Sequence, residues 1–144
     1  MSSVAPAARG VATPGYHPTL LLVGRVLLAA IFLIAGVRKA MGIAGTAGYF
    51  TKLGMPMADL LVYVAIIVEI GCGLMLLVGW KTRWSAWLLI LFVLVATGMA
   101  HRFWEFDAAA QANQMNHFLK NLAIIGGLLF VAGFGPGRAS VDKS

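Results

Sequence analysis

A single carboxylate, Glu69, stands near the middle of the apolar run Leu60–Gly79. A charged side chain at the centre of a membrane-spanning helix costs about 2.5–3.5 kcal/mol, even on the most permissive insertion scales. We therefore expect Glu69 to face the interior of a helix bundle, where it is either protonated or paired with a basic group. A carboxylate in such a place either holds helices together or exchanges a proton with a bound ligand.

Arg25 is the partner that the sequence suggests for Glu69. With a rise of 1.5 Å per residue, Glu69 lies about 15 Å from the end of its run that is nearer the chain termini, and Arg25 about 9 Å from the same side. An arginine side chain is long enough to bridge this difference. We predict an Arg25–Glu69 pair, which either locks the first two helices together or lines a site for a proton, a quinone or a small anion.

Other polar residues are expected to gather in the half of the bundle away from the termini. Lys39 shares a helical face with Arg25, His101 follows the third apolar run, and His117 shares a face with Asn121 in the fourth. A lone histidine at a helix end is usually an interfacial residue, but here side chains converge from several helices. The predicted polar cavity contains Arg25, Lys39, Glu69, His101, His117 and Asn121.

Metal and thiol chemistry find less support. His101 and Glu105 are four residues apart, which would place two ligands on one helical face, and several methionines occur towards the same end. Methionine more often fills irregular gaps in packing, so we assign no metal ligand. Cys72 is the only cysteine, which excludes an intramolecular disulfide and a dithiol motif.

The elements that must position these residues are membrane-spanning helices. Of 144 residues, 60% are hydrophobic and 11% charged, whereas soluble domains carry about 25% charged residues. We predict an all-α integral membrane four-helix bundle over residues 19–136, with a mobile tail at 1–18 and a short C-terminal tail at 137–144. The four predicted spans are Thr19–Val37, Leu60–Gly79, Trp84–Ala100 and about His117–Phe134.

Two polar segments are also expected to be helical. The stretch AGTAGYFTKLG, residues 44–54, is a candidate for a short interfacial helix, and DAAAQANQMN, residues 107–116, extends the fourth span with Asp107 as its cap. Four spans place both termini on one side. The short basic hairpin Lys81–Arg83 and the basic C-terminal tail favour the cytoplasmic side of a bacterial inner membrane.

Several segments resemble the DoxX family of small four-helix bacterial membrane proteins. They are RVLLAAIFLIAGVRKAMG, LGMP, VEIGCGLMLLVGWKTR, ATGMAHRFW, KNLAIIGGLLFVAGFG and GPGRASVD, which occur in this order over residues 20–142. The residues that carry the family pattern are Arg25, Gly36, Lys39, Glu69, His101, Asn121, Ser140 and Asp142. The family is similar to the membrane subunit of thiosulfate:quinone oxidoreductase, which implies a place in membrane redox or thiol-stress complexes.

Three functions follow from these patterns. The first is an accessory subunit that offers a quinone-type site to a partner oxidoreductase; because the sequence has no redox cofactor motif, a bound quinone or the partner must carry the electrons. The second is a small-molecule or proton-coupled transporter, and the third a non-catalytic scaffold. The expected partners are the lipid bilayer, an oxidoreductase subunit and a second copy of the chain. Nucleic acid is excluded, because the basic residues lie between apolar runs rather than in one patch.

Overall fold

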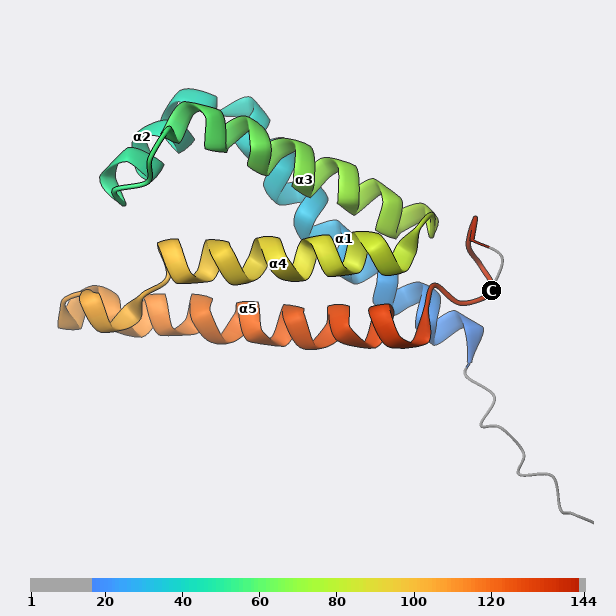
Figure 1. Cartoon of the computed structure of the whole chain (residues 1–144). Coiled ribbons are helices and arrows are strands. Elements are labelled where there is room, and N and C mark those ends of the chain that lie inside the picture. The colour runs from blue at the N-terminus through green and yellow to red at the C-terminus, as the bar shows by residue number, and fades with distance from the viewer. Residues whose placement is uncertain (1–16, 143–144) are drawn as a thin grey trace, which may run out of the picture.

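The chain forms a bundle of long helices whose axes run roughly side by side (Figure 1). The computed structural model describes residues 17–142, which contain no strand. The helices are α1 (Pro18–Met41), α2 (Ile43–Lys52), α3 (Ala58–Val78), α4 (Thr82–Ala100) and α5 (Ala108–Phe134), with a 3-10 turn, η1 (Phe103–Glu105), before α5. Four of them are long and apolar enough to cross a membrane: α1, α3, α4 together with η1, and α5. The all-α prediction and the four predicted spans are confirmed.

The helix boundaries differ from the predicted spans mainly at the polar ends. α5 begins at Ala108 because the Asp107 side chain caps it, with Oδ1 accepting a hydrogen bond from the backbone N–H of Ala110 at 3.0 Å. The stretch at 44–54 is largely helical, as α2. Most of the predicted mobile tail, residues 1–16, lies outside the described residues, and Pro18 belongs to the first turn of α1.

The helices diverge from one end of the bundle to the other. α1 packs against α3, α4 against α5, and α3 against α4, whereas α2 packs against α1 and α3 only. α3 and α4 meet at a tight turn that begins at Gly79, whose φ of 72° is left-handed and favours glycine. From this turn α3 and α4 separate, and α2 lies over the open end (Figure 1). We call the end with Gly79 the closed end and the other the open end.

Two glycines allow α1 and α3 to approach closely. A Cβ atom added at Gly36 would lie 2.6 Å from Cγ1 of Ile70 and 3.1 Å from Cβ of Glu69. A Cβ atom added at Gly73 would lie 2.9 Å from a methyl carbon of Leu33. Small residues let helix backbones come close where no hydrophobic effect drives association, as inside a bilayer. The contact at Gly36 brings the end of α1 beside the middle of α3.

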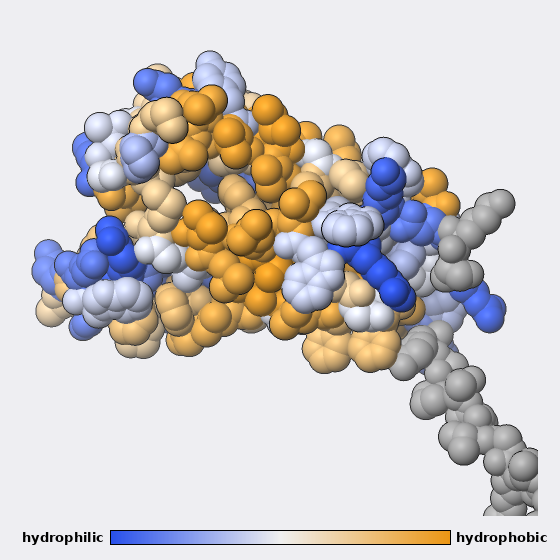
Figure 2. Space-filling view, viewed as in Figure 1, coloured by the Kyte–Doolittle hydropathy of each residue, from blue (hydrophilic) through white to orange (hydrophobic). Residues whose placement is uncertain are grey.

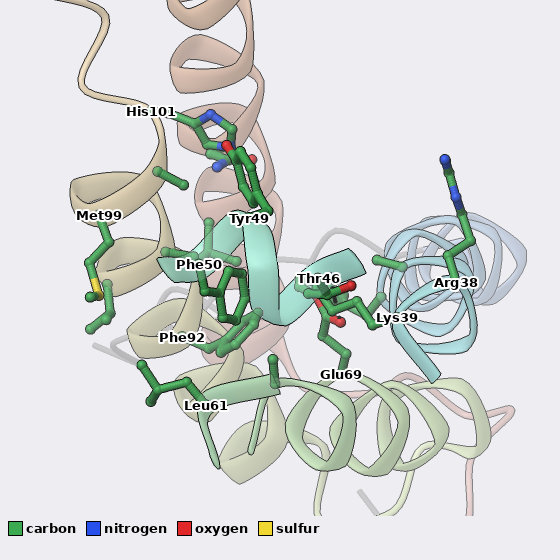
Figure 3. Close-up of a pocket in the computed structure, with 18 of the residues that line it drawn as sticks. Arg38, Lys39, Thr46, Tyr49, Phe50, Leu61, Glu69, Phe92, Met99 and His101 are labelled. Carbon is green, nitrogen blue, oxygen red and sulfur yellow. Dashed lines mark hydrogen bonds and ion pairs between the residues drawn. The ribbon is translucent and has the colours of Figure 1, made fainter. Parts of the chain in front are cut away.

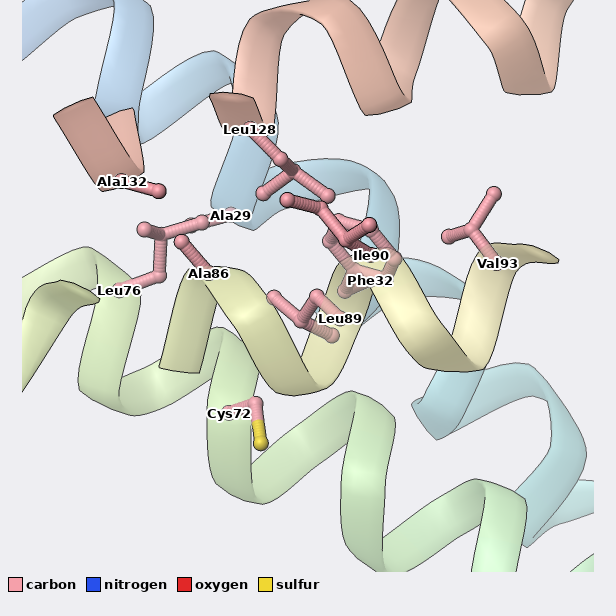
Figure 4. Close-up of a cluster of buried hydrophobic side chains, with 10 residues drawn as sticks. All are labelled: Ala29, Phe32, Cys72, Leu76, Ala86, Leu89, Ile90, Val93, Leu128 and Ala132. Atoms are coloured by element: carbon pink, nitrogen blue, oxygen red, sulfur yellow. The ribbon is translucent and has the colours of Figure 1, made fainter. Parts of the chain in front are cut away.

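The closed half of the bundle contains the core. Its buried side chains come from α1, α3, α4 and α5, and they pack around fully buried Leu76, Leu89 and Leu128 (Figure 4). The other members are Ala29, Phe32, Cys72, Ala86, Ile90, Val93 and Ala132. Because lipid tails are as apolar as these side chains, the gain comes from close packing rather than from removal of water.

The segment after α5 seals the closed end. Asp142 accepts hydrogen bonds from the backbone N–H groups of Lys81 and Thr82, both at 2.8 Å, and from the Thr82 hydroxyl at 2.9 Å. These N–H groups belong to the start of α4, where no intrahelical acceptor exists, so Asp142 serves as the cap of a helix sixty residues away in the chain. The backbone N–H of Asp142 also donates to the Gly79 carbonyl at 2.7 Å.

Candidate functional site

A buried ion pair joins α1 to α3 at the middle of the bundle. The Lys39 ammonium donates to both carboxylate oxygens of Glu69, at 2.8 and 2.9 Å, and the Glu69 side chain is only 6% exposed. Lys39 lies in the last turn of α1, yet it reaches Glu69 because side chains on a helix point back towards its N-terminus. Lys39 therefore extends from the open end into the interior, and the pair neutralises a carboxylate at membrane depth (Figure 3).

The predicted Arg25–Glu69 pair is wrong. Arg25 is buried, but its guanidinium donates to the backbone carbonyls of Pro136 and Ala139, in the segment after α5. The same geometric rule explains the error: an arginine on α1 points towards the N-terminus of α1, which is the closed end, and so away from Glu69. Arg25 belongs to the seal of the closed end and does not line the cavity described next.

A cavity of about 730 Å³ opens beside the Lys39–Glu69 pair. Space-filling atoms show it as a hollow below α2 (Figure 2). Its apolar lining includes Phe50 of α2, Leu61 and Val64 of α3, and Phe92 and Val95 of α4. Its polar lining consists of Arg38, Lys39, Thr46, Tyr49, Glu69, His101, Lys120 and Asn121, and Arg38 points away from the other labelled side chains (Figure 3).

The two histidines, His101 at the end of α4 and His117 in α5, form a stacked pair. Nδ1 of His101 donates to the Gln114 side-chain oxygen at 2.8 Å, which leaves Nε2 of His101 as an acceptor in the neutral ring. The ring of His117 stacks on that of His101, with 5.0 Å between centroids, and Nδ1 of His117 lies 3.2 Å from the Lys120 ammonium. His101 lines the cavity. His117 does not line it but stacks on the His101 ring from outside.

Asn121 is held in place by a short hydrogen-bond chain. Its side-chain nitrogen donates to the Thr97 hydroxyl at 2.9 Å, and that hydroxyl donates to the Val93 carbonyl at 2.6 Å. Because an amide nitrogen carries two hydrogens, Asn121 keeps a second donor on the cavity side of α5. The chain of bonds fixes the position of that donor.

The structure brings together Lys39, Glu69, His101 and Asn121 around one cavity, with His117 adjacent and Arg25 elsewhere. Residue-by-residue interpretation of the sequence missed Gln114 and the α2 side chains Thr46, Tyr49 and Phe50. Gln114 lies three residues before His117 in the segment predicted to extend the fourth helix, so this spacing already places the two side chains on one face. The contribution of α2 depends on how it folds back over the bundle, for which the sequence has no signal.

The described residues hold no group of three or more His, Cys, Asp or Glu side chains that could bind a metal. The spacing of His101 and Glu105 does not act as a helical i, i+4 pair, because α4 ends at Ala100 and Glu105 lies in η1. Oε2 of Glu105 instead lies 3.1 Å from Nε of Arg102 in an exposed ion pair.

Four apolar spanning helices around a polar pair and a cavity define an integral membrane helical-bundle protein. Comparison with known proteins gives the family: the DoxX family model matches residues 20–102, and the chain belongs to this family. It is 36% identical to the inner membrane protein YphA of Escherichia coli over 127 residues, which cover 88% of this chain and 91% of YphA.

Two further relatives also match most of this chain. The inner membrane protein YqjF of Escherichia coli is 36% identical over 122 residues, which cover 85% of this chain and 88% of YqjF. The Surfeit locus protein 4 homolog of Schizosaccharomyces pombe is 30% identical over 124 residues, a match that covers 85% of this chain but 36% of that protein. No solved structure matches the chain.

Proposed function

We propose that this DoxX-family protein is a membrane subunit that binds a quinone-type ligand in the cavity beside Lys39 and Glu69. The observation that carries the proposal is the Lys39–Glu69 pair, which faces a cavity of about 730 Å³ with mainly apolar walls. Small-ligand sites combine such walls with a few convergent polar groups. Ion pairs at membrane depth are expensive, and they often mark ligand or proton sites.

The polar groups suit the two redox states of a quinone. The carbonyl oxygens of the oxidised form need donors, which Lys39 and the second N–H of Asn121 supply. The hydroxyl groups of the reduced form need acceptors, which Nε2 of His101 supplies in the neutral ring. Phe50 and Phe92 belong to the apolar lining and offer aromatic faces to the quinone ring.

Reduction of a quinone consumes two electrons and two protons. Glu69 is a group in the cavity that can take up and release a proton, and Lys39 compensates its charge when it is ionised. The electrons come from a partner oxidoreductase, which docks on the membrane protein and supplies the cofactor. The proposed role is thus to hold the quinone and conduct its protons, not to store electrons.

The second candidate function, transport, requires access from both sides of the membrane. The closed half of the bundle is filled by the core and sealed by Arg25 and Asp142. A cavity that ends at a packed core favours binding over passage. Transport of a small molecule through the reconstituted protein would overturn this preference.

We place both termini in the cytoplasm of the bacterial cell. The proposal rests on the very short hairpin that carries Lys81 and Arg83 and on the basic tail with Arg138, because short basic loops next to spanning helices favour the cytoplasmic side. Reporter enzymes that are active only in the cytoplasm or only in the periplasm, fused after Ser144 and next to Lys52, test the orientation. A periplasmic signal from the C-terminal fusion contradicts it.

Titration of the purified protein in lipid nanodiscs with a short-tailed ubiquinone tests the binding site. We expect His101→Ala to weaken binding by about fivefold or more, since one lost hydrogen bond to a ligand group is worth about 1 kcal/mol or more. We expect Glu69→Gln to weaken binding as well, because the Lys39 donor then loses the partner that holds it in place. Lys52→Met is the matched control, because Lys52 is exposed on α2 and does not line the cavity. Folded protein that binds no quinone at saturating concentration contradicts the proposal and favours the scaffold.

A further inference from the structure

The cavity has two edges of different chemistry. Where it meets α1 and α5, the exposed lining residues are Arg38 and Lys120, which are cationic. Where it meets α3 and α4, the exposed lining residues are Val64 and Val95, which are 44% and 52% exposed. A residue that lines a cavity and is also exposed on the outer face of a spanning helix marks a place where the cavity reaches the surface.

The apolar edge lies within the depth of the bilayer. Val64 is roughly 9 Å along α3 from its start at Ala58, and Val95 is roughly 8 Å from the end of α4 at Ala100, at 1.5 Å per residue. Both belong to apolar spans. The surface that they share therefore faces lipid chains and not water. The divergence of α3 from α4 creates this gap, because the two helices meet at the turn at Gly79 and separate from there towards the open end (Figure 1).

The residues that line the gap determine which part of a ligand can lie in it. Polar groups of a ligand find no partner among Val64, Val95 and Leu61, whereas hydrocarbon is accommodated without loss. A buried polar partner stands further inside, at Glu69, and His101 lines the cavity at the end of α4. A molecule with an apolar chain and a polar head thus matches the cavity in one direction only, with the head inside and the chain in the gap.

We propose that the ligand enters the cavity from the bilayer between α3 and α4, and that it carries an apolar tail which lies against Val64 and Val95. The inference deepens the proposed function, on which it rests for the nature of the head group, and it names the class of ligand as a lipid-dissolved, tailed molecule. Water-soluble analogues without a tail then bind in the cavity weakly and enter it by a route other than the gap between α3 and α4.

Thiol labelling tests the path without any quinone. Ala65 lines the cavity and is only 4% exposed, so a thiol introduced by Ala65→Cys is reached through the cavity. The background carries Cys72→Ala. In liposomes, the introduced thiol reacts with a maleimide on a long alkyl chain, which dissolves in the bilayer, or with a charged, water-soluble thiosulfonate. Val64→Trp combined with Val95→Trp fills the gap.

The matched control combines Ile67→Trp with Leu91→Trp. These residues lie on the same two helices and are 70% and 59% exposed, but neither lines the cavity. We expect the double substitution in the gap to slow labelling by the alkyl maleimide at least tenfold and to leave the labelling rate of the charged reagent unchanged. The control pair should leave the labelling rates of both reagents unchanged. Equal slowing of both reagents, or no slowing of the alkyl maleimide, overturns the proposal.

A tail-length series separates this inference from the proposed function. We expect a decyl-tailed quinone to bind at least tenfold more tightly than the same ring without a tail, after correction for partitioning into lipid, and the gap-filling pair to remove this difference. Labelling from the bilayer without any quinone binding supports the entry path and overturns the proposed quinone-binding function. Quinone binding that does not depend on tail length overturns the proposed contact of the tail with Val64 and Val95. If the tryptophan pair fails to fold, Val64→Phe and Val95→Phe singly replace it.

Discussion

The two halves of this bundle are built from the same four helices but packed in different ways. In the closed half, leucines with no exposed surface fill the space between helices, and the segment after α5 is bonded to α1 and α4. In the open half, α3 leaves α4, and a cavity takes the place of a core. The contrast teaches that most of the packed core lies at one end and most of the candidate site at the other. Phe32 and Val93 belong to both the core and the cavity wall, so the two halves meet there.

The largest effect is expected from breaking the ion pair between the halves. Lys39→Met leaves the Glu69 carboxylate buried and unpaired, which costs on the order of 3–5 kcal/mol in a dry site. Combining it with Glu69→Gln should recover much of the loss, as measured by thermal unfolding in detergent. Arg25→Met combined with Glu69→Gln serves as the control, because those residues share no contact and their losses should add. Additive losses for the Lys39 pair would contradict the coupling.

The second effect compares the same truncation in the two halves. Leu89→Ala in the core should lower stability by about 2–5 kcal/mol, since Leu89 has no exposed surface and its removal leaves a void. Leu61→Ala at the wall of the existing cavity should cost less than half as much, because few contacts are lost there. Denaturation in mild detergent measures both. Equal losses would show that the open half is as tightly packed as the closed half.

A smaller effect is expected from widening the contact between α1 and α3. Gly36→Ala places a methyl group where Ile70 and Glu69 stand, and overpacking of this kind costs about 1–3 kcal/mol. It should also weaken ligand binding, because it displaces Glu69. Gly126→Ala is the control, since a Cβ atom there meets no neighbour within 4 Å. A neutral Gly36→Ala would mean that the helices can separate at no cost.

The smallest effect concerns the seal of the closed end and depends on pH. The hydrogen bonds from the Thr82 backbone and then Lys81 hold the pKa of Asp142 below its usual value. A depressed carboxyl pKa stabilises the fold above the unfolded value of about 3.9, and this contribution is lost as pH falls through the lower folded pKa. Asp142→Ala should therefore lower the thermal midpoint at pH 7, and its difference from wild type should shrink below about pH 4. A difference that persists at low pH would contradict the charged cap.

The sequence alone determined the helices and the buried charge. The length of each apolar run sets a spanning helix, because a bilayer leaves backbone groups no partner but each other. Asp107 capped α5 as expected, because a cap acts over only three residues. That Glu69 faces inwards also follows from the sequence, since a carboxylate in lipid is too costly.

Only the tertiary structure decided which groups meet. Lys39 rather than Arg25 pairs with Glu69, because side-chain direction along α1 outweighs the axial distances that a linear estimate uses. The Asp142 cap joins residues sixty positions apart, and such a contact leaves no local pattern in the sequence. The cavity exists because α3 and α4 diverge beneath α2. That divergence results from the summed packing of all the helices and is encoded in no single segment.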